Sequence, residues 1–222
     1  MKNHQNRFTL GSLLRIIALL ALFFGAIVAY NKWELKTHTE TIESFLIDAK
    51  VRVEDALALE DDTNITIREA VNKALESAKK IDESIIQLKK LDQSAVKEHQ
   101  EKALGILLAT GDFMRTQSTM NLNHAENRFQ LAKLEPMLAE ITTGKSPNDL
   151  SAVEQSSIAE IRAKLGLLKA NFDVFYFERL QATSHLVDAT NEAKHLFSEK
   201  SLINTVNYQA AIQELDRFKS AE

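Results

Sequence analysis

Residues 158–196 read IAEIRAKLGLLKANFDVFYFERLQATSHLVDATNEAKHL, and this stretch decides the fold class. Starting at Ile158, twelve positions alternate in spacings of three and four residues, and eleven of them are apolar, with Arg179 as the exception. That spacing keeps one stripe of an α-helix apolar over about eleven turns. Ser151 and Glu154, just upstream, have the spacing of a capping box. The stretch therefore predicts one long amphipathic helix that begins near residue 151.

The same spacing predicts two further helices earlier in the chain. One covers residues 35–56, and the other covers residues 67–88 behind a capping box formed by Thr66 and Glu69. A third predicted helix starts at Asp92 or Ser94 and runs to about Ile141. The turn before it leaves two alternatives open: two separate helices, or one rod of roughly 110 Å at ~1.5 Å per residue.

The third helix is predicted to carry two apolar stripes. One stripe consists of Leu104, Leu107, Gly111, Met114, Ser118, Leu122, Ala125 and Phe129; the other has Ile106, Phe113 and Met120 beside Thr110, Gln117, His124 and Asn127. The loop TTGKSPND at residues 142–149 ends this helix, because glycine, proline and asparagine together favour a turn. After Ser198, apolar residues at near-helical spacing predict a fifth helix or an extension of the fourth.

These patterns predict an all-α protein. The 222 residues include only two prolines and six glycines, so few positions force a helix to break. Helices that are apolar along one stripe bury it against one another, either in an antiparallel bundle of four or five helices or in a coiled coil with another subunit. The chain has no cysteine, which excludes disulfides and thiolate chemistry, and an absence of cysteine fits a bacterial envelope protein.

The N-terminal segment LLRIIALLALFFGAIVAY, residues 13–30, predicts a membrane helix. It holds a single charge, Arg15, and spans roughly 27 Å at ~1.5 Å per residue, close to a ~30 Å hydrocarbon core. Arg15 at one end is placed to reach the headgroups, and Tyr30 and Trp33 stand where interfacial aromatic residues anchor the other end. We therefore expect a transmembrane signal anchor over residues 13–32 that continues directly into the first bundle helix.

The charges around this segment predict its direction. Residues 1–33 contain four basic residues and no acidic one, which leaves 23 basic and 31 acidic residues in the remainder. The positive-inside rule then places residues 1–12 in the cytoplasm and exports residues 33–222, as expected of a single-pass protein of the bacterial inner membrane with a periplasmic domain. The alternative is a signal peptide cleaved after Ala29, which also gives an exported domain.

Several function classes have little support in the sequence. The exported part is acidic and lacks a basic stripe, which argues against nucleic-acid binding. Glu192 and His195 have the spacing of one half of a di-iron motif, but no second copy exists. No nucleophile elbow or nucleotide-binding loop occurs either. We therefore expect no enzymatic activity, no cofactor and no metal site.

One segment suggests a ligand site. Residues 171–180 read NFDVFYFERL, and a hairpin of the third and fourth helices turning near residue 145 or 146 would place Phe175 opposite Thr116, Phe172 opposite Thr119 and Met120, and Arg179 opposite Asp112. The candidate ligand-binding residues are Arg179, Phe172, Phe175, Tyr176, Thr110 and Gln117. Aromatic residues at helical spacing more often fill a core, which is the interpretation that we favour.

The sequence thus supports two functional expectations. The first is a non-enzymatic, membrane-anchored helical bundle that mediates protein–protein interaction in the cell envelope, as a scaffold or accessory subunit, through other envelope proteins or through self-association. The 4-3 spacing of its stripes motivates it. The alternative is a sensor-like four-helix bundle that recognises a small anionic molecule at the aromatic segment.

Overall fold

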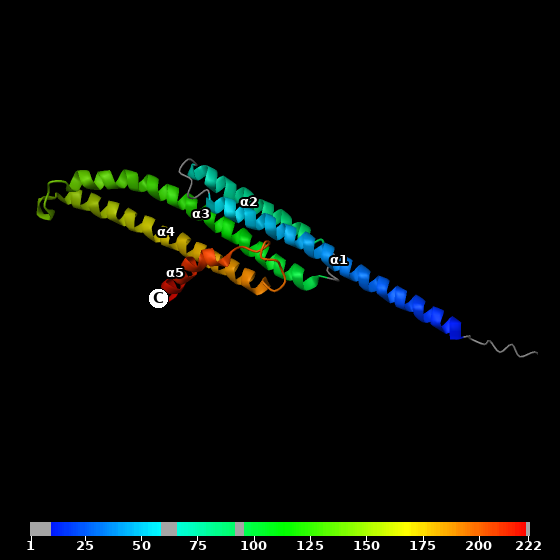
Figure 1. Cartoon of the computed structure of the whole chain (residues 1–222). Coiled ribbons are helices and arrows are strands. Elements are labelled where there is room, and N and C mark those ends of the chain that lie inside the picture. The colour runs from blue at the N-terminus through cyan, green and yellow to red at the C-terminus, as the bar shows by residue number, and fades with distance from the viewer. Residues whose placement is uncertain (1–9, 59–65, 92–95, 221–222) are drawn as a thin grey trace, which may run out of the picture.

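A computed structural model describes residues 10–58, 66–91 and 96–220, and all the secondary structure in these ranges is helical (Figure 1). The elements in chain order are α1 (Leu10–Ala58), α2 (Ile67–Leu88), α3 (Lys97–Thr142), the short 3-10 helix η1 (Pro147–Asp149), α4 (Ala152–Ala193), the 3-10 helix η2 (Thr205–Tyr208) and α5 (Gln209–Ser220). The predicted all-α class and helical bundle are confirmed. Helices α2 and α3 are separate rather than one rod, and α5 is a helix of its own.

Two of the helices begin at the predicted capping boxes. The Thr66 hydroxyl accepts a hydrogen bond from the Glu69 backbone N–H, and the Glu69 carboxylate accepts one from the Thr66 N–H at 2.9 Å. Ser151 and Glu154 make the same reciprocal pair at the start of α4. For α3 the first cap residue is Val96, without a side-chain cap, and the predicted caps Asp92 and Ser94 lie outside the described residues.

Helix α3 is the central helix of the bundle. It packs against α2, α4 and the second half of α1, while α4 also carries η2 and α5. This position explains the two stripes of α3: between residues 106 and 118 both are buried, one towards each neighbour. The residues buried there are Ile106, Leu107, Thr110, Gly111, Phe113, Met114, Gln117 and Ser118.

The predicted stripes of the other helices form the rest of the core. In α1 the buried residues are Ile42, Leu46, Ala49, Val53 and Ala56, and in α2 they are Val71, Ala74, Ala78, Ile81, Ile85 and Leu88. In α4, Ile158, Ile161, Ala182, Leu186 and Ala193 are buried as predicted. Burying a large aliphatic side chain stabilises the fold by about 1.5–3 kcal/mol, so these stripes hold the bundle together.

The irregular segment after α4 closes the core against α1. Glu43 of α1 accepts a hydrogen bond from the Ser198 backbone N–H at 2.7 Å, and its carboxylate oxygen lies 3.4 Å from the Ser201 hydroxyl. The side chains of Phe197, Leu202 and Ile203 are buried in the same core. Val206 of η2 is exposed.

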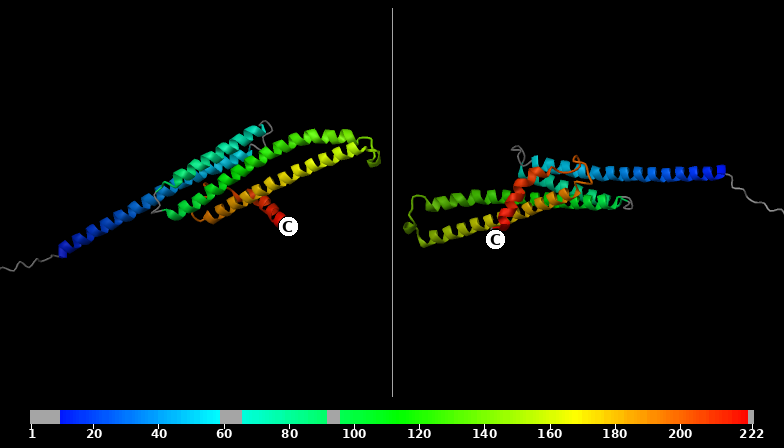
Figure 2. Two further views of the ribbon diagram at one scale, coloured as in Figure 1. Left: turned by 180° about the vertical axis from the view of Figure 1, so that it is seen from behind. Right: turned by 60° about the horizontal axis from the view of Figure 1, so that its bottom comes forward.

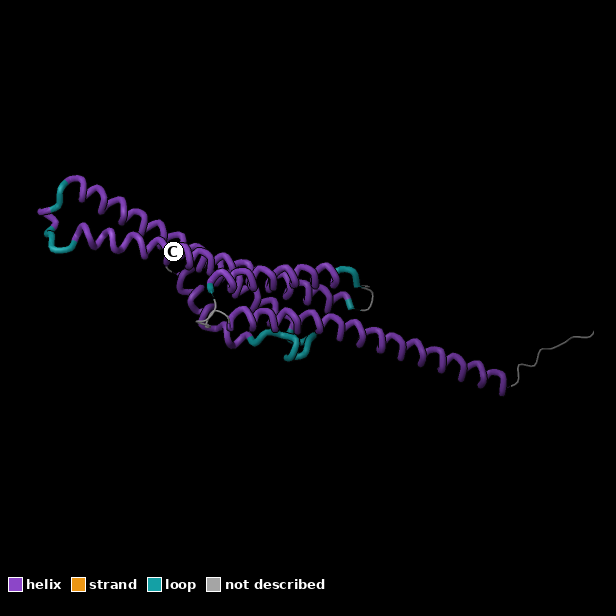
Figure 3. Tube along the Cα trace, turned by 90° about the horizontal axis from the view of Figure 1, so that it is seen from above, coloured by secondary structure: helices purple, strands orange, loops and turns teal. Residues whose placement is uncertain are grey.

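The molecule is an elongated rod (Figure 2). The first half of α1 projects alone from one end of the bundle, and the distal halves of α3 and α4 project from the opposite end as a two-helix hairpin, which Figure 3 shows from above. The loop between α3 and α4 is therefore at the end of the rod opposite to Leu10, where α1 begins. We call α3 from Thr119 onward and α4 up to Glu178, with the loop between them, the distal hairpin.

The predicted continuity of the N-terminal segment with the first bundle helix is confirmed, because α1 is unbroken from Leu10 to Ala58. Among the residues that the structure describes, no helix has a stretch that is both long enough and apolar enough to cross a membrane. The predicted span 13–32 starts in residues 10–18, whose side chains, including that of Arg15, lie outside the described part. The membrane segment is not supported by the structure and stays a prediction.

Candidate functional site

The distal hairpin is held together by a thin inner contact. Leu134 of α3 and Ile158 and Ile161 of α4 are buried in it. Asn127 is buried as well, and its side-chain amide donates a hydrogen bond of 3.2 Å to the Leu168 carbonyl across the hairpin. A two-helix hairpin buries only the side of each helix that faces the other, so its remaining sides face solvent.

Those remaining sides carry large apolar side chains that are exposed. On α3, Leu122 and Phe129 are 61% and 55% exposed, and on α4 Leu167 and Val174 are 65% and 56% exposed. All four lie at helical positions roughly opposite the inner contact. A helix that is apolar on two sides is typical of one with neighbours on both. The distal hairpin is therefore the candidate interaction site.

The outer side of α4 changes character along the helix. Residues Ala159, Ala163, Gly166, Leu167, Ala170 and Val174 recur on that side in the distal hairpin, and all are exposed. Further along, within the bundle, the same side carries the polar residues Ser184, His185, Asp188 and Glu192. The apolar outer side is thus confined to the hairpin, whereas the bundle has a solvated face.

Capping and an ion pair fix the tip of the hairpin. Gly144 has a φ of 75°, a left-handed conformation that glycine adopts without strain. Lys145 pairs with Glu154, and Ser151 donates both its N–H and its hydroxyl to the same carboxylate. These contacts lower the pKa of Glu154 from 4.5 to about 2, the Lys145 ammonium being the largest cause.

The predicted ligand residues come together only in part. Phe172 stacks on Tyr176 with ring centroids 5.9 Å apart, and Phe172 also meets the ring of His124 edge-on at 6.1 Å. Phe175, Tyr176 and Arg179 are half-buried on the same helix. The predicted pairing across the hairpin was wrong by about one helical turn, because Phe172 lies opposite His124 instead of Thr119 and Met120.

The two predicted polar residues on α3 lie deeper in the bundle. Thr110 is buried and donates its hydroxyl hydrogen bond to the Ile106 carbonyl at 2.7 Å within its own helix. Gln117 is buried too; its amide nitrogen lies 3.4 Å from the Asn121 side-chain oxygen, and its own side-chain oxygen has no hydrogen-bond partner among the described residues. Near them, Phe113 contacts Tyr208 edge-on at 6.2 Å.

Helix α5, which sequence reasoning did not connect to the aromatic segment, packs against it. The Tyr176 hydroxyl donates a 2.6 Å hydrogen bond to Glu214, and the ring of Phe218 contacts Tyr176 and Phe177 at 6.3 and 6.1 Å. Burial, followed by the contact with Glu214, raises the pKa of Tyr176. The apolar residues Leu215 and Phe218 indicated that α5 packs against another part of the protein. They did not indicate which helix they contact.

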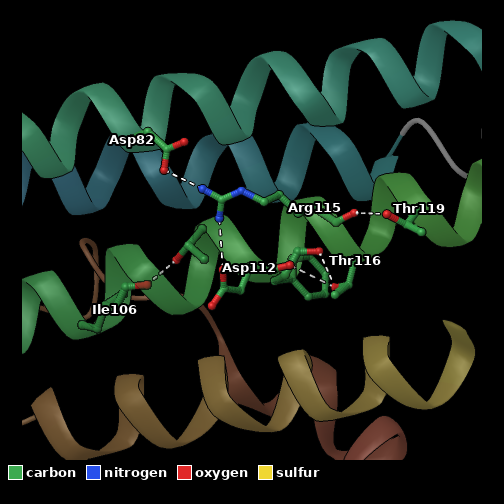
Figure 4. A network of polar contacts seen from close by, with 8 residues as sticks. Asp82, Ile106, Asp112, Arg115, Thr116 and Thr119 are labelled. Atoms are coloured by element: carbon green, nitrogen blue, oxygen red, sulfur yellow. Dashed lines mark hydrogen bonds and ion pairs between the residues drawn. The ribbon is translucent and has the colours of Figure 1, made fainter. Parts of the chain in front are cut away.

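Asp112, the predicted partner of Arg179, pairs with Arg115 of its own helix at 3.0 Å (Figure 4). The same guanidinium reaches Asp82 of α2 at 2.6 Å, so Arg115 bridges the two helices. Gly111 leaves room for it, since a Cβ at that position would lie 3.1 Å from the Arg115 guanidinium. The side chains of Arg115 and Asp82 are nearly half-exposed and that of Asp112 is 70% exposed, which limits their contribution to stability.

The described residues give little support for a metal site or for a ligand pocket at the predicted residues. Glu192 pairs with Lys102 at 2.7 Å, and His195 lies 3.7 Å from Glu98, so the E-x-x-H residues have other partners. In the described ranges no three His, Cys, Asp or Glu residues are grouped to hold a metal ion. Three hollows on the described surface lie elsewhere, beside Arg52, beside Arg162 and beside Lys194.

Comparison with protein-family models, with curated proteins and with solved structures gives no match for this chain.

Proposed function

We propose that this chain is a non-enzymatic, single-pass membrane protein of the bacterial inner membrane, whose exported rod binds other proteins of the cell envelope or a second copy of itself. The observation that carries the proposal is the distal hairpin, which is apolar on its outer sides and extends beyond the bundle. Large apolar side chains that are gathered on an exposed helix face mark interaction sites.

The N-terminal half of α1 supports the membrane part of the proposal. Leu19, Leu20, Leu22, Phe23, Phe24 and Val28 are all more than half exposed, and their positions cover every side of the helix. A helix that is apolar all round and has no protein neighbour requires a nonpolar surrounding. Tyr30 and Trp33, with ring centroids 6.2 Å apart, then stand at the outer interface, and the basic residues before the segment keep the N-terminus in the cytoplasm.

The rod shape gives the hairpin a defined reach in this proposal. From Tyr30 to Ala58 the helix rises roughly 42 Å, and from Thr119 to Thr142 a further 35 Å or so, at ~1.5 Å per residue. The loop between α3 and α4 would then stand on the order of 80 Å from the membrane surface. A partner reached by the tip need not be a membrane protein.

The alternative, recognition of a small anionic molecule near Arg179, has weaker support. Its aromatic residues contact one another, His124 and α5, and the described hollows are lined by other residues. Binding there would first require α5 to move.

In-membrane crosslinking of the full-length protein followed by mass spectrometry tests the proposal. We expect reproducible crosslinks from the distal hairpin to one envelope complex or to a second copy, and loss of these crosslinks in a Phe129→Glu, Leu167→Glu variant. A matched control is Leu108→Glu, which changes an exposed leucine in the bundle. Absence of crosslinks from the hairpin would contradict the proposal.

Membrane anchoring is tested separately by alkaline extraction of membranes. We expect the full-length protein to stay in the membrane pellet, and Leu20→Lys with Phe24→Lys to release it, because a lysine at the centre of a span costs about 2.5–3.5 kcal/mol. A wild-type protein recovered in the soluble fraction would refute the anchor.

A further inference from the structure

One outer stripe of the distal hairpin has the pattern of a coiled-coil seam. On α3, the residues Leu122, Ala125, Phe129, Ala132, Pro136 and Ala139 alternate in spacings of three and four, as the a and d positions of a heptad do. All of them are exposed except Ala125, which is half-buried. We call these six residues the α3 outer seam.

The α3 outer seam continues an interface that exists within the molecule. In the bundle, the same stripe of α3 includes Leu107, Met114 and Ser118, and it is buried. The Gln100–Leu88 hydrogen bond and the Arg115–Asp82 ion pair show that α2 runs antiparallel to α3 beside it. Beyond Ser118 the stripe remains apolar but is exposed. The exposed part therefore has the same residue pattern as the part against which α2 packs.

The charges beside the seam favour one kind of occupant. Glu126 and Lys133 lie at e positions on one side, and Arg128 and Glu135 lie at g positions on the other, each pair seven residues apart. All four side chains are exposed. Glu126 accepts a 2.7 Å hydrogen bond from the Gln130 amide, and the Lys133 ammonium lies 3.9 Å from the centroid of the Phe129 ring. Because residues seven apart on one helix do not reach each other, the two charges of each pair do not neutralise one another, and each can meet an opposite charge on a helix that packs on the seam.

Two copies of the seam match each other when they run antiparallel. In an antiparallel pair, e positions face e positions and g positions face g positions. With the two-fold axis between Phe129 and Ala132, Glu126 faces Lys133 of the second copy, and Arg128 faces Glu135 of the second copy. Symmetry doubles both pairs, so four ion pairs of opposite sign flank the seam.

The parallel arrangement is disfavoured by the same residues. In parallel pairing each g position faces the e position five residues further along the second copy. Arg128 would then face Lys133, and Glu135 would face Glu140, which places like charges together on both sides. The charge pattern therefore distinguishes the two directions, as e and g residues do in coiled coils.

We propose that a second copy of this chain occupies the α3 outer seam, antiparallel and centred between Phe129 and Ala132. This proposal names the partner of the protein-binding function above and rests on that function. The overlap from Thr119 to Thr142 is roughly 35 Å long at ~1.5 Å per residue, and it ends where each bundle begins. The two N-termini point in opposite directions, so a pair anchored at both ends joins two membrane surfaces that face each other.

The absence of cysteine from the sequence makes the geometry directly testable by disulfide crosslinking. Full-length Leu122→Cys and Ala139→Cys proteins are purified in detergent, mixed and oxidised, because these two positions face each other in the antiparallel pair, whereas each lies 17 residues, roughly 25 Å at ~1.5 Å per residue, from the same residue of the second copy. We expect the mixture to give several-fold more disulfide-linked dimer than either protein alone. Val174→Cys, exposed on the outer side of α4, is the control and is expected to remain monomeric. Strong crosslinking of Leu122→Cys alone would show a parallel pair and overturn the proposal.

Charge reversal provides a second test of the antiparallel pair. Glu126→Lys places like charges at two symmetry-related contacts, and we expect dimer dissociation, measured by analytical ultracentrifugation in detergent, to become about tenfold easier. Lys133→Glu added to Glu126→Lys restores opposite charges and is expected to restore the wild-type constant. Circular dichroism checks that both surface variants fold.

A protein that stays monomeric at every concentration, or a double variant that is not rescued, overturns the pairing. The protein-binding function would survive that outcome if the hairpin still crosslinks to another envelope protein in membranes. If neither self-crosslinks nor such crosslinks occur, both proposals fail.

Discussion

The Tyr176 hydroxyl on α4 donates a 2.6 Å hydrogen bond to the Glu214 carboxylate on α5. An irregular segment that includes η2 joins these two helices along the chain. Helix α5 packs on α4 and η2, and the ring of Phe218 adds contacts with Tyr176 and Phe177. This small contact area decides where the last helix of the chain lies. It also covers the aromatic segment from which the alternative ligand site was predicted.

Loss of this hydrogen bond is expected to loosen α5 without unfolding the bundle. Tyr176→Phe removes the donor and keeps the ring, and since the site is partly solvated we expect a loss of about 1 kcal/mol or less. Amide hydrogen exchange should accelerate in residues 209–220 and stay unchanged in α2. Glu178→Gln, an exposed change on the same helix, is the control. Equal exchange in Tyr176→Phe and wild type would show that Phe218 alone holds α5.

Tyr176 of α4 and Tyr208 of η2 are expected to make the stability of the protein depend on pH in the alkaline range. Burial raises the pKa of Tyr176 and of Tyr208 above 10.0; the contact with Glu214 raises that of Tyr176 further, and the charge of Glu54 raises that of Tyr208. The folded state thus favours the neutral phenols. Their contribution is fully present below pH 10 and is lost as the pH rises through the folded-state values.

We therefore expect the free energy of unfolding to fall above about pH 10, and to fall less steeply in Tyr208→Phe. Urea titrations at a series of pH values measure this slope. Tyr30→Phe, in the part of α1 outside the bundle, is the control and should keep the wild-type slope. A Tyr208→Phe protein that loses stability as steeply as the wild type would assign the effect to other groups.

Acid is expected to act at the tip of the distal hairpin. The Lys145 ammonium and the Ser151 donors hold the pKa of Glu154 at about 2, below its ordinary 4.5, so its contribution is present above pH 4.5 and is lost as the pH falls towards 2. Amide exchange in residues 142–155 should then accelerate in this interval, and Glu154→Gln should show the fast exchange already at neutral pH. Glu140→Gln, exposed near the end of α3, is the control. If amide exchange in residues 142–155 does not change with acid, the carboxylate of Glu154 does not stabilise the tip.

Helix limits and buried stripes could be predicted because they depend on local rules. The capping boxes at Thr66 and Ser151 and the buried Ile42, Leu46 and Val53 follow from hydrogen bonding within four residues and from the 3.6-residue period. None of these features needs knowledge of a distant part of the chain.

The pairing between helices was harder to predict, because it depends on loop geometry. The prediction placed the reversal near residue 145 or 146, but the 3-10 helix Pro147–Asp149 shifts the reversal towards the C-terminus. Phe172 consequently meets His124. The docking of α5 was missed for a related reason: its position is set by Tyr176 and Glu214, which are 38 residues apart.

The spacing of apolar residues predicted the two stripes of α3, but it did not predict which neighbouring helices cover them. Both are buried where α3 lies between α2 and α4, and only the stripe towards α4 stays covered in the distal hairpin. Leu122 and Phe129 were predicted on a core stripe and are exposed instead. A pattern of apolar residues indicates that a helix packs against something, but not whether the partner belongs to the same chain.

Adjacent leucines on α3 offer a matched test of the bundle core. Leu107 is 0% and Leu108 50% exposed, although they are neighbours in one helix. Leu107→Ala leaves a cavity among α1, α2 and α3 and is expected to cost about 2–5 kcal/mol, whereas Leu108→Ala should cost well under 1 kcal/mol. Chemical denaturation of both variants measures the difference. Similar losses would show that α3 is rotated relative to the described packing.

Arg179 provides the test that separates protein binding from ligand binding. It lies close enough to Tyr176 and Tyr208 for its charge to act on both, within a cluster whose aromatic rings pack on one another. If the cluster is structural, Arg179→Ala lowers the melting temperature through lost packing, and a panel of small carboxylates and phosphates leaves the wild-type melting temperature unchanged. If one of these anions raises the wild-type melting temperature and Arg179→Ala abolishes the rise, the cluster is a binding site, since only a ligand that prefers the folded state stabilises it. We expect the first result, because α5 already covers the rings that such a ligand would contact.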